Sequence, residues 1–465
     1  MRRRQRRWLV FLVVLGCAAG LLVRVGTPAA HGVTGQRFLT DAQGRTLILY
    51  GLDADGTSAV SSAPAAAQEY GVLGDDLTRL TLSWSRVEPR PGHYDDAYLA
   101  GIAQKIAWYA EQGFHVVPAM QQDAYGPAPA TPRTGTPAAT GARTSAADEF
   151  WRTRGDRPEL QDRYAAAWQH VARYLGAYVT RHGLKPDPIV GYDLLDRPWG
   201  GSVEGAAFET GPLARCYQRL IDALRTVDPV HWLFVEPAAV TADWGLPSSL
   251  PYLNDPRRGE ARIGYAPQLF PAPLDPDGQY TGGSVFPTDR ALASWAIQVT
   301  RTAKRLDAPV LLGAWGLDAT TPGAHLYLDH VQQLIDQMMI GAAFYSAAPG
   351  AWSPWEQKGK PADIAGVLET AYPRAIAGVP LEFDYDKGTL VFTLQFRDET
   401  DVSGPTEIYL PPSDFPRGPQ IDFDADYVSS WDPVRHVLSL TVDRPLRGNV
   451  HTLHLTPQGP AHTYS

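Results

Sequence analysis

Cysteine, basic residues and long apolar runs are all scarce in this chain of 465 residues. The two cysteines are Cys17, near the N-terminus, and Cys216, in a predicted helix, so we expect no disulfide in the folded body. Cys216 is most simply a small buried apolar residue. The net charge is −9, and the first 24 residues carry six arginines and no acid, which leaves −15 for the rest. This acidic body argues against nucleic acid, and against anionic lipid head groups, as main partners.

The N-terminal segment combines an arginine cluster with an apolar run. Five arginines precede the run from Trp8 to Val23, a pattern typical of a secretory leader or a short anchor whose arginines stay in the cytoplasm. The run is shorter than the roughly 20 residues that span a bilayer, and no clean Ala-x-Ala cleavage site follows it. We expect residues 1–35 to be a signal peptide or membrane anchor plus linker. The body is then extracytoplasmic, either secreted or membrane-anchored.

Signatures of several reaction classes are absent from the sequence. It contains no Gly-x-Ser-x-Gly elbow, no Walker phosphate loop, no paired-histidine metal motif and no dinucleotide fingerprint. His451 and His454 lie in a predicted strand with no acidic partner at metal-ligand spacing, so we expect them to be core or surface residues. We therefore expect neither a cofactor nor a metal.

Short apolar runs followed by helical patterns organise most of the chain. The runs are continuous rather than alternating, as is typical of strands covered on both faces. The clearest helical pattern runs from Tyr98 to Tyr109, with Asp95 as a possible N-cap and Gly113 at its end. Eight such strands alternating with helices predict an α/β fold, a (β/α)₈ TIM barrel with function at the strand C-terminal ends. The expected strands are Leu47–Leu52, Leu77–Ser83, His115–Ala119, Ile189–Leu195, His231–Val235, Ile263–Ala266, Val310–Ala314 and Gly341–Tyr345.

From about Pro373 the pattern changes to short alternating strands. Two of them flank Asp386-Lys387-Gly388, which is a hairpin signal. We expect a barrel over residues 36–374 and a small C-terminal antiparallel β-sandwich with its tail over residues 375–465. The low-complexity segment 126–147 follows the third strand on the functional face. It is interpreted as either a mobile lid or a disordered insertion, and disorder is favoured.

Several motifs together carry a resemblance to a known family. They are RFLTDAQGRTLILYGLD, LTRLTLSWSRVEPRPGHYDDAYL, AMQQDAYG, YAAAWQHVARYLG and, at residues 190–201, VGYDLLDRPWGG. In this combination, residues 37–372 resemble glycoside hydrolase family 5, in its endoglycoceramidase-like branch. The resemblance implies a barrel that uses two glutamates to cleave glycosidic bonds. In a retaining glycosidase the two carboxyl groups stand about 5 Å apart.

The resemblance also assigns roles to particular positions, and most of these are substituted. Arg79 matches the arginine that braces the nucleophile. Asp196 stands where the family has the asparagine that holds the sugar, and Arg197 where it has the acid/base glutamate. Ala314, in VLLGAWG, stands at the nucleophile position. Gln121 and Gln268 replace histidines, Phe270 replaces a tyrosine, and Tyr345 occupies the position of the tryptophan that floors the sugar site.

These substitutions predict that the family mechanism is lost. A guanidinium stays protonated and cannot act as a general acid, and alanine can neither attack nor carry charge. Arg79 would also lose its expected anion. The chain is therefore expected not to be an enzyme by the family mechanism, with no catalytic residues assigned. Five carboxylates on or near the functional face could instead supply a relocated pair: Asp123, Asp193, Glu204, Glu236 and Asp318.

Aromatic side chains remain plentiful around the expected cleft. Aromatic rings stack on the C–H faces of sugars and also suit acyl chains. Trp199, Trp352 and Trp355 are the better binding candidates, whereas Trp84 and Trp315 are expected to be structural. The cleft or ligand-binding candidates are thus Arg79, Gln121, Asp123, Asp196, Arg197, Trp199, Glu236, Gln268, Phe270, Trp315, Tyr345 and Trp352.

Three hypotheses follow for function. In the first, an exported and membrane-tethered glycosidase-like protein binds a cell-envelope glycan or glycolipid in its former active-site cleft without catalysis. In the second, the chain is an active O-glycosyl hydrolase that uses relocated carboxylates. In the third, the barrel is a structural platform for a cell-envelope protein partner. The expected partners are a glycan or glycolipid, and a membrane contacted through the N-terminal segment.

Overall fold

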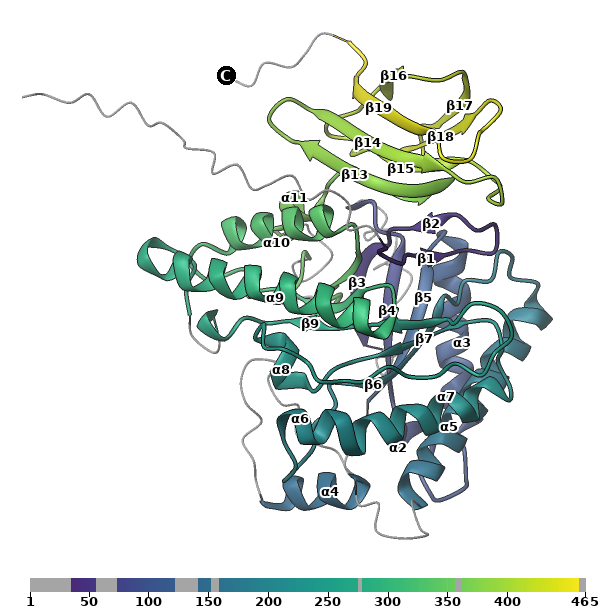
Figure 1. The fold of residues 1–465 in the computed structure, drawn as a ribbon, viewed down its shortest axis with the longest axis vertical. Coiled ribbons are helices and arrows are strands. Elements are labelled where there is room, and N and C mark those ends of the chain that lie inside the picture. The colour runs from purple at the N-terminus through teal and green to yellow at the C-terminus, as the bar shows by residue number, and fades with distance from the viewer. Residues whose placement is uncertain are drawn as a thin grey trace, which may run out of the picture. The chain divides into compact units, whose positions relative to one another are not determined.

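The computed structural model describes residues 35–55, 73–121, 141–151, 159–274, 278–348, 350–355 and 362–459. A parallel sheet of nine strands, in the order β8-β7-β6-β5-β4-β3-β11-β10-β9, forms the first part (Figure 1). Its longer strands are fully buried or nearly so, because both of their faces are covered. The strands are β3 (Tyr50–Asp55), β4 (Leu77–Ser83), β5 (His115–Gln121), β6 (Gly191–Asp196), β7 (Trp232–Val235), β8 (Ile263–Tyr265), β9 (Gln268–Leu269), β10 (Leu311–Trp315) and β11 (Gly341–Tyr345).

The sixth barrel strand is broken in two, and the sheet closes at this break. β8 pairs with β7, whereas β9 pairs with β10, and Ala266 and Pro267 separate the two pieces. Tyr265 also forms a parallel bridge with Val310, the residue before β10. Both ends of the sheet thus meet around this interrupted strand, as a (β/α)₈ barrel requires. The predicted fold class is confirmed.

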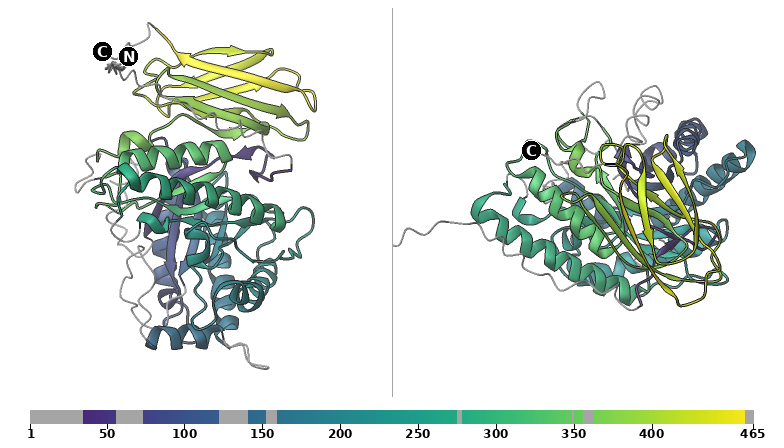
Figure 2. Two further views of the ribbon diagram at one scale, coloured as in Figure 1. Left: turned by 60° about the vertical axis from the view of Figure 1, so that its left-hand side comes forward. Right: turned by 90° about the horizontal axis from the view of Figure 1, so that it is seen from above.

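Helices follow the strands and lie on the outside of the sheet (Figures 1 and 2). α3 begins after Asp95, whose side chain accepts a hydrogen bond from the Tyr98 N–H at 2.9 Å, so the predicted N-cap is confirmed. The longer helices are α3 (Asp96–Glu111), α4 (Gly141–Trp151), α5 (Glu159–His182), α7 (Ala214–Arg225), α9 (Val285–Leu306) and α10 (Ala324–Met338). The shorter ones are α2 (Trp84–Val87), α6 (Gly205–Phe208), α8 (Ala239–Asp243) and α11 (Ala365–Leu368).

α4 corrects part of one expectation. Residues 141–147 of the low-complexity segment form its first turns and are not disordered, while residues 126–140 lie outside the described residues. Among the helices that the structure describes, none has the length and apolarity needed to cross a membrane. The apolar run from Trp8 to Val23 falls outside that part of the chain.

Two antiparallel sheets make up the C-terminal part, seen edge-on in Figure 2. One is β13-β14-β19-β16, and the other is β1-β2-β12-β15-β18-β17. The second sheet thus includes two short strands from near the N-terminus, because Leu47 pairs with Ala375 and Thr46 with Ile376. The strands are β1 (Leu39–Thr40), β2 (Thr46–Leu47), β12 (Tyr372–Ile376), β13 (Gly378–Asp386), β14 (Val391–Asp398), β15 (Thr406–Tyr409), β16 (Pro419–Phe423), β17 (Tyr427–Asp432), β18 (Val437–Val442) and β19 (Val450–Pro457).

His451 of β19 lies between two carboxylates that the sequence analysis did not identify. Its Nδ1 is 3.0 Å from Asp424 and its Nε2 is 3.0 Å from Asp398. These carboxylates raise the pKa of His451 although burial opposes the charged form. No group of His, Cys, Asp and Glu suited to a metal ion occurs in the described ranges.

Candidate functional site

Arg79 lies at the centre of the candidate site, on β4. It is the register partner of Asp53 on β3, so both side chains leave the sheet on the same face. Arg79 is only 1% exposed, although an arginine is almost never fully buried unless it is paired. The surrounding strands must therefore supply its anions.

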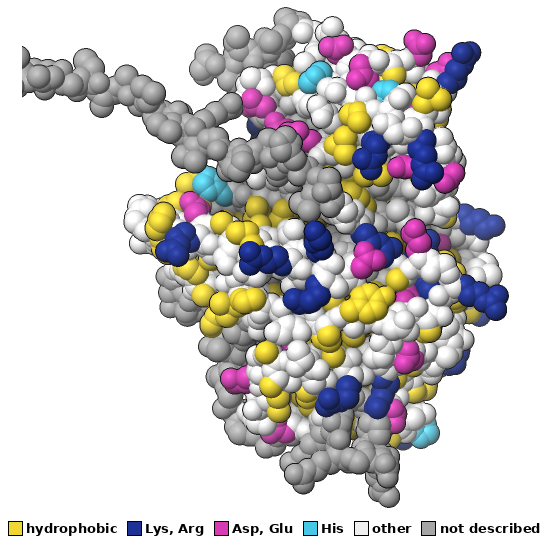
Figure 3. Space-filling view, viewed as in Figure 1, with side chains coloured by type: hydrophobic (Ala, Val, Ile, Leu, Met, Phe, Trp, Pro, Cys, Tyr) yellow, Lys and Arg dark blue, Asp and Glu magenta, His cyan; other side chains and the backbone are white. Residues whose placement is uncertain are grey.

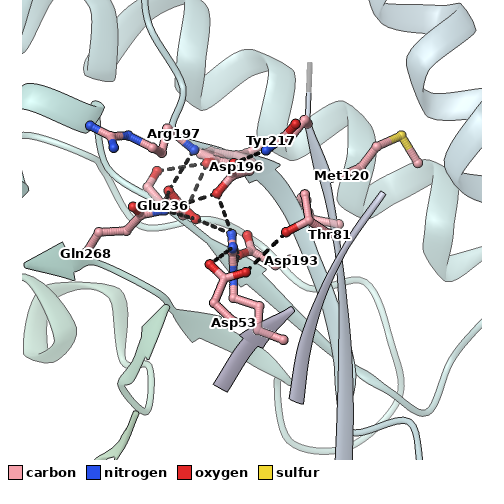
Figure 4. A network of polar contacts seen from close by, with 12 residues as sticks. Asp53, Thr81, Met120, Asp193, Asp196, Arg197, Tyr217, Glu236 and Gln268 are labelled. Atoms are coloured by element: carbon pink, nitrogen blue, oxygen red, sulfur yellow. Dashed lines mark hydrogen bonds and ion pairs between the residues drawn. The ribbon is translucent and has the colours of Figure 1, made fainter. Parts of the chain in front are cut away.

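Four carboxylates supply them, and Figure 4 shows these side chains converging from β3, from β6 and from the residue after β7. Arg79 Nη1 donates to Asp53 at 3.2 Å, and Nε and Nη2 donate to the same oxygen of Asp193 at 2.9 and 2.6 Å. Nη2 also lies 2.7 Å from Asp196 Oδ1 and 2.9 Å from Glu236 Oε1. Arg79 thus has carboxylate partners although Ala314 supplies none, because acids from β3, β6 and the end of β7 reach it.

Two amide side chains complete this carboxylate cluster. Gln268 Nε2, on β9, donates to Asp196 Oδ1 at 3.1 Å and to both Glu236 oxygens at 3.1 and 3.2 Å. Gln121 Nε2, at the end of β5, donates to Asp196 Oδ2 at 3.2 Å. Both residues act here as hydrogen-bond donors to acids. They hold the carboxylates in place but cannot transfer protons near neutral pH.

One guanidinium cannot neutralise four buried carboxylates. Burial raises the pKa of Glu236 well above its ordinary value, and the charge of Asp193 adds to this, while Arg79 opposes it. Burial likewise raises the pKa of Asp193 to about 6, against the lowering effect of Arg79. The carboxylates in turn hold the pKa of Arg79 well above its usual range, although burial acts in the opposite direction. The cluster thus favours the protonated form of Glu236 more strongly than water does, beside a permanently charged arginine.

Arg197 turns its side chain away from the carboxylate cluster, as Figure 4 shows. Its backbone N–H donates to Glu236 Oε2 at 2.8 Å, while its guanidinium donates to Asp243 at 3.0 Å and lies 5.8 Å from the centre of the Phe270 ring. Arg197 has a φ of 51°, in the left-handed region that few residues other than glycine adopt. This turn presents the backbone of Arg197, rather than its charge, to Glu236.

Ala314 lies fully buried on β10, in register with Gln268. A Cβ built on the preceding residue, Gly313, would stand 3.7 Å from both Arg79 Nε and Glu236 Oε1. β10 therefore passes directly beside the carboxylate cluster without contributing an acid to it. The space next to Arg79 and Glu236 is bordered by small residues at this point.

The aromatic candidates divide by exposure. Trp199, Tyr345 and Trp352 are partly exposed, whereas Phe270 and Trp315 are buried. Trp352 lies 6.0 Å from Tyr345 and 6.3 Å from Phe270, measured between ring centres, so these three form one aromatic group. Trp355 is buried, which corrects its selection as a binding candidate. Trp84 and Trp315 are buried as expected, and Trp84 Nε1 donates to Glu88 at 2.9 Å.

Sequence reasoning missed some members of this site and included others that lie apart from it. Asp53 was not singled out, although its place at the end of the first long strand was a usable signal, and Asp243 on α8 had no signal. Glu204 is exposed, and Asp318 accepts from the Thr320 N–H in its own turn. Asp123 lies outside the described residues. The structure thus brings together Arg79, Gln121, Asp196, Glu236 and Gln268, with Asp193 and Asp53.

Known proteins share this architecture. Residues 40–357 match the family described as cellulase (glycosyl hydrolase family 5), and residues 371–455 match the glycoside hydrolase family 5 C-terminal domain. Endoglycoceramidase I of Rhodococcus hoagii (strain 103S) is 26% identical over 478 residues, covering 92% of this chain and 90% of that protein. Endo-glycoceramidase II from Rhodococcus sp., in its ganglioside GM3 complex, is 35% identical with a TM-score of 0.81, covering 91% of this chain and 100% of that chain.

These findings confirm the family resemblance and correct one expectation. The expectation that the chain is not an enzyme is wrong, because over nine-tenths of its length it matches proteins that are endoglycoceramidases by name. That expectation rested on the substitutions at Arg197 and Ala314. It did not take into account the acids that surround Arg79.

Proposed function

Because the chain belongs to glycoside hydrolase family 5, we propose that it hydrolyses the glycosidic bond of a glycolipid, with carboxylates of the Arg79 cluster as its acid and nucleophile. The glycolipid is inferred from the ganglioside that the related endo-glycoceramidase II binds. The partly exposed Trp199, Tyr345 and Trp352 offer surfaces on which sugar rings stack. The proposal depends on the cluster containing two acids in different protonation states.

Glu236 and Asp196 are the pair that carries the proposal. Both accept from Arg79 Nη2 and from Gln268 Nε2, so their nearest oxygens lie less than about 6 Å apart. A separation of about 5–5.5 Å between carboxyl groups suits a retaining glycosidase, in which one group attacks and the other protonates the leaving oxygen. Of the two, Asp196 is the more exposed, and Glu236 has the raised pKa that a general acid needs.

The proposed roles follow from this difference. Glu236 gives its proton to the leaving glycosidic oxygen while the Asp196 carboxylate forms a bond to the anomeric carbon. The ionised Glu236 then takes a proton from water, which displaces Asp196 and releases the sugar. Gln121 and Gln268 orient Asp196 through both of its oxygens, and Arg79 offsets the charge that moves between the two acids.

The N-terminal segment supports a proposal about location. Five arginines followed by an apolar run are typical of a leader or anchor that leaves the body outside the cytoplasm. A body placed there would meet glycolipids of the cell envelope. Fractionation of cells that express the full chain, followed by protease accessibility, tests this location, and a body protected in the cytoplasm would contradict it.

The activity is tested with ganglioside GM3 as the substrate and the full chain as the enzyme. Release of the oligosaccharide and of ceramide is measured for the wild type and for Glu236→Gln, Asp196→Asn and Glu204→Gln. We expect the first two changes to lower kcat at least 100-fold. Glu204→Gln removes an exposed carboxylate from the same end of the barrel and should leave kcat within twofold. A folded wild type that binds GM3 without turnover would overturn the proposal.

A further inference from the structure

The outer face of α9 has an amphipathic pattern that the barrel core does not explain. Phe286, Arg290, Ile297, Arg301 and Lys304 recur at helical spacing and are all exposed, Phe286 at 69% and Ile297 at 50%. The opposite face of the same helix is buried through residues such as Trp295 and Val299. Large apolar side chains thus alternate with basic ones on the side that faces solvent.

A neighbouring segment extends this face. Arg305 donates to the carbonyl oxygens of Leu250 at 3.1 Å and Ser248 at 2.9 Å, and Ser294 donates to that of Gly245 at 2.8 Å. These hydrogen bonds hold residues 245–250 against α9. Leu246 lies in this segment and Tyr252 just after it, and they are 49% and 57% exposed. The combined surface, called the α9 face below, consists of Leu246, Tyr252, Phe286, Arg290, Ile297, Arg301 and Lys304.

The basic side chains of the α9 face are not neutralised locally. Within the described parts of the chain, Arg290, Arg301 and Lys304 have no carboxylate within ion-pair distance. Asp289, the acid on the same helix, instead accepts from Tyr280 and lies 3.7 Å from His330 Nδ1. Figure 3, which views this side of the molecule, shows dark blue and yellow side chains along the position of α9.

We propose that the α9 face docks on a membrane surface that contains anionic lipids. Apolar and aromatic side chains beside arginine and lysine are the composition of helices that lie in the membrane interface. Each basic side chain near an anionic surface strengthens binding about fivefold. The acidic body does not prevent this contact, because at physiological salt charges act over only about 8 Å. Docking requires no turnover, so the proposal stands apart from the proposed hydrolysis.

The buried side of α9 connects this face to the carboxylate cluster. Trp295 Nε1 donates to the backbone oxygen of Gln268 at 2.9 Å, and Gln268 holds both Asp196 and Glu236. The helix that contacts the membrane would thus also fix the strand that positions the acids. Docking through the α9 face would hold the candidate site beside the surface in which glycolipids reside.

Vesicle co-sedimentation of the full chain tests the docking. The probes are phosphatidylcholine vesicles with and without phosphatidylserine, at physiological salt. Arg290→Glu/Arg301→Glu/Lys304→Glu is expected to weaken binding to the anionic vesicles at least 100-fold. The control Arg173→Glu/Arg181→Glu/Lys185→Glu makes the same charge change at exposed positions on and just after α5 and should have less than a threefold effect. The N-terminal apolar run is common to all variants, so differences between them report on the α9 face.

A second pair of variants tests the apolar side chains. Phe286→Ser/Ile297→Ser is expected to weaken binding to both kinds of vesicle about tenfold or more. Val428→Ser/Val434→Ser removes two exposed valines, one on β17 and one in the turn after it, and should leave binding unchanged. Circular dichroism checks that every variant is folded. Equal vesicle binding by the α9 and control variants overturns the proposal, as does a wild type that binds soluble polyanions but no vesicles.

Discussion

Replacing Arg79 by methionine removes the one cation that four buried carboxyl groups share. The side chain is 1% exposed, and its partners Asp53, Asp193, Asp196 and Glu236 have side chains that are 1–5% exposed. Breaking a buried ion pair from one side costs roughly 3–5 kcal/mol, because it leaves an uncompensated charge. We expect Arg79→Met to lower the free energy of unfolding by about that amount at pH 8. Urea unfolding followed by circular dichroism measures it.

The loss of stability caused by Arg79→Met should be smaller in acid. The direction of this pH dependence follows from the raised carboxyl pKa values. Asp193 already has a pKa of about 6 in the folded protein, above its ordinary value, and Glu236 is also raised. A carboxyl group with a raised pKa favours folding at low pH, and that contribution is lost as the pH rises through about 4 to 6. Without Arg79 the carboxyl pKa values rise further. At pH 5 the acids can take up protons, so we expect the cost there to be less than half of that at pH 8.

Arg79→Lys is the matched control. It keeps the positive charge but cannot form the fork of hydrogen bonds that reaches four carboxylates. We expect a loss of about 1–2 kcal/mol, with a weaker dependence on pH than for Arg79→Met. A loss below 1 kcal/mol for Arg79→Met at pH 8, or an equal loss at pH 5 and pH 8, would refute the account of the cluster as an undercompensated set of acids.

Three further predictions concern the fold. Gly51→Ala would place a Cβ 1.8 Å from the carbonyl oxygen of Leu77, so we expect a loss of more than about 3 kcal/mol or no soluble protein, judged by expression and gel filtration. Asp95→Ala removes the cap on the Tyr98 N–H and should cost about 1 kcal/mol in urea unfolding, and an unchanged midpoint would count against the cap. His451 has a raised pKa, so its two ion pairs favour folding below about pH 6.5 and lose that effect as the pH rises through the raised value. His451→Gln should therefore destabilise more at pH 6 than at pH 9, and the opposite order would contradict the charged state.

The sequence predicted the barrel strands well because each is a short run rich in buried residues between more polar segments. β4 was predicted at its full length, from Leu77 to Ser83. The first strand was predicted at Leu47–Leu52, but β3 begins at Tyr50. The difference arises because Thr46 and Leu47 pair with strand β12, about 330 residues later. Local hydrophobicity does not reveal which distant strand a residue will join.

The candidate site was also predicted only in part, because its residues come from distant strands. The sequence indicated Arg79, Asp196, Glu236 and Gln268 one at a time, but not that one nitrogen of Arg79 would bind three acids at once. Asp193 was named among the carboxylates that could supply a relocated pair, but no partner was predicted for it. Its bond to Arg79, 114 residues earlier, depends on strands β4, β5 and β6 lying side by side. The charged side chains meet only because the sheet closes into a barrel. The order of residues along the chain does not predict which of them will meet.

The sheet that β1 and β2 share with β12 has a consequence for dissecting the protein. Strands from both ends of the described chain hydrogen-bond to one another, and Arg374 also donates to the Gly74 carbonyl oxygen at 2.6 Å. A fragment that stops at residue 374 would keep β1 and β2 but lose Ala375 and Ile376, which pair with β2, and so leave an open sheet edge prone to aggregation. The separate C-terminal fragment would lack two of its strands. Expression of excised fragments should therefore be designed around residues 36–49 and 371–459 together.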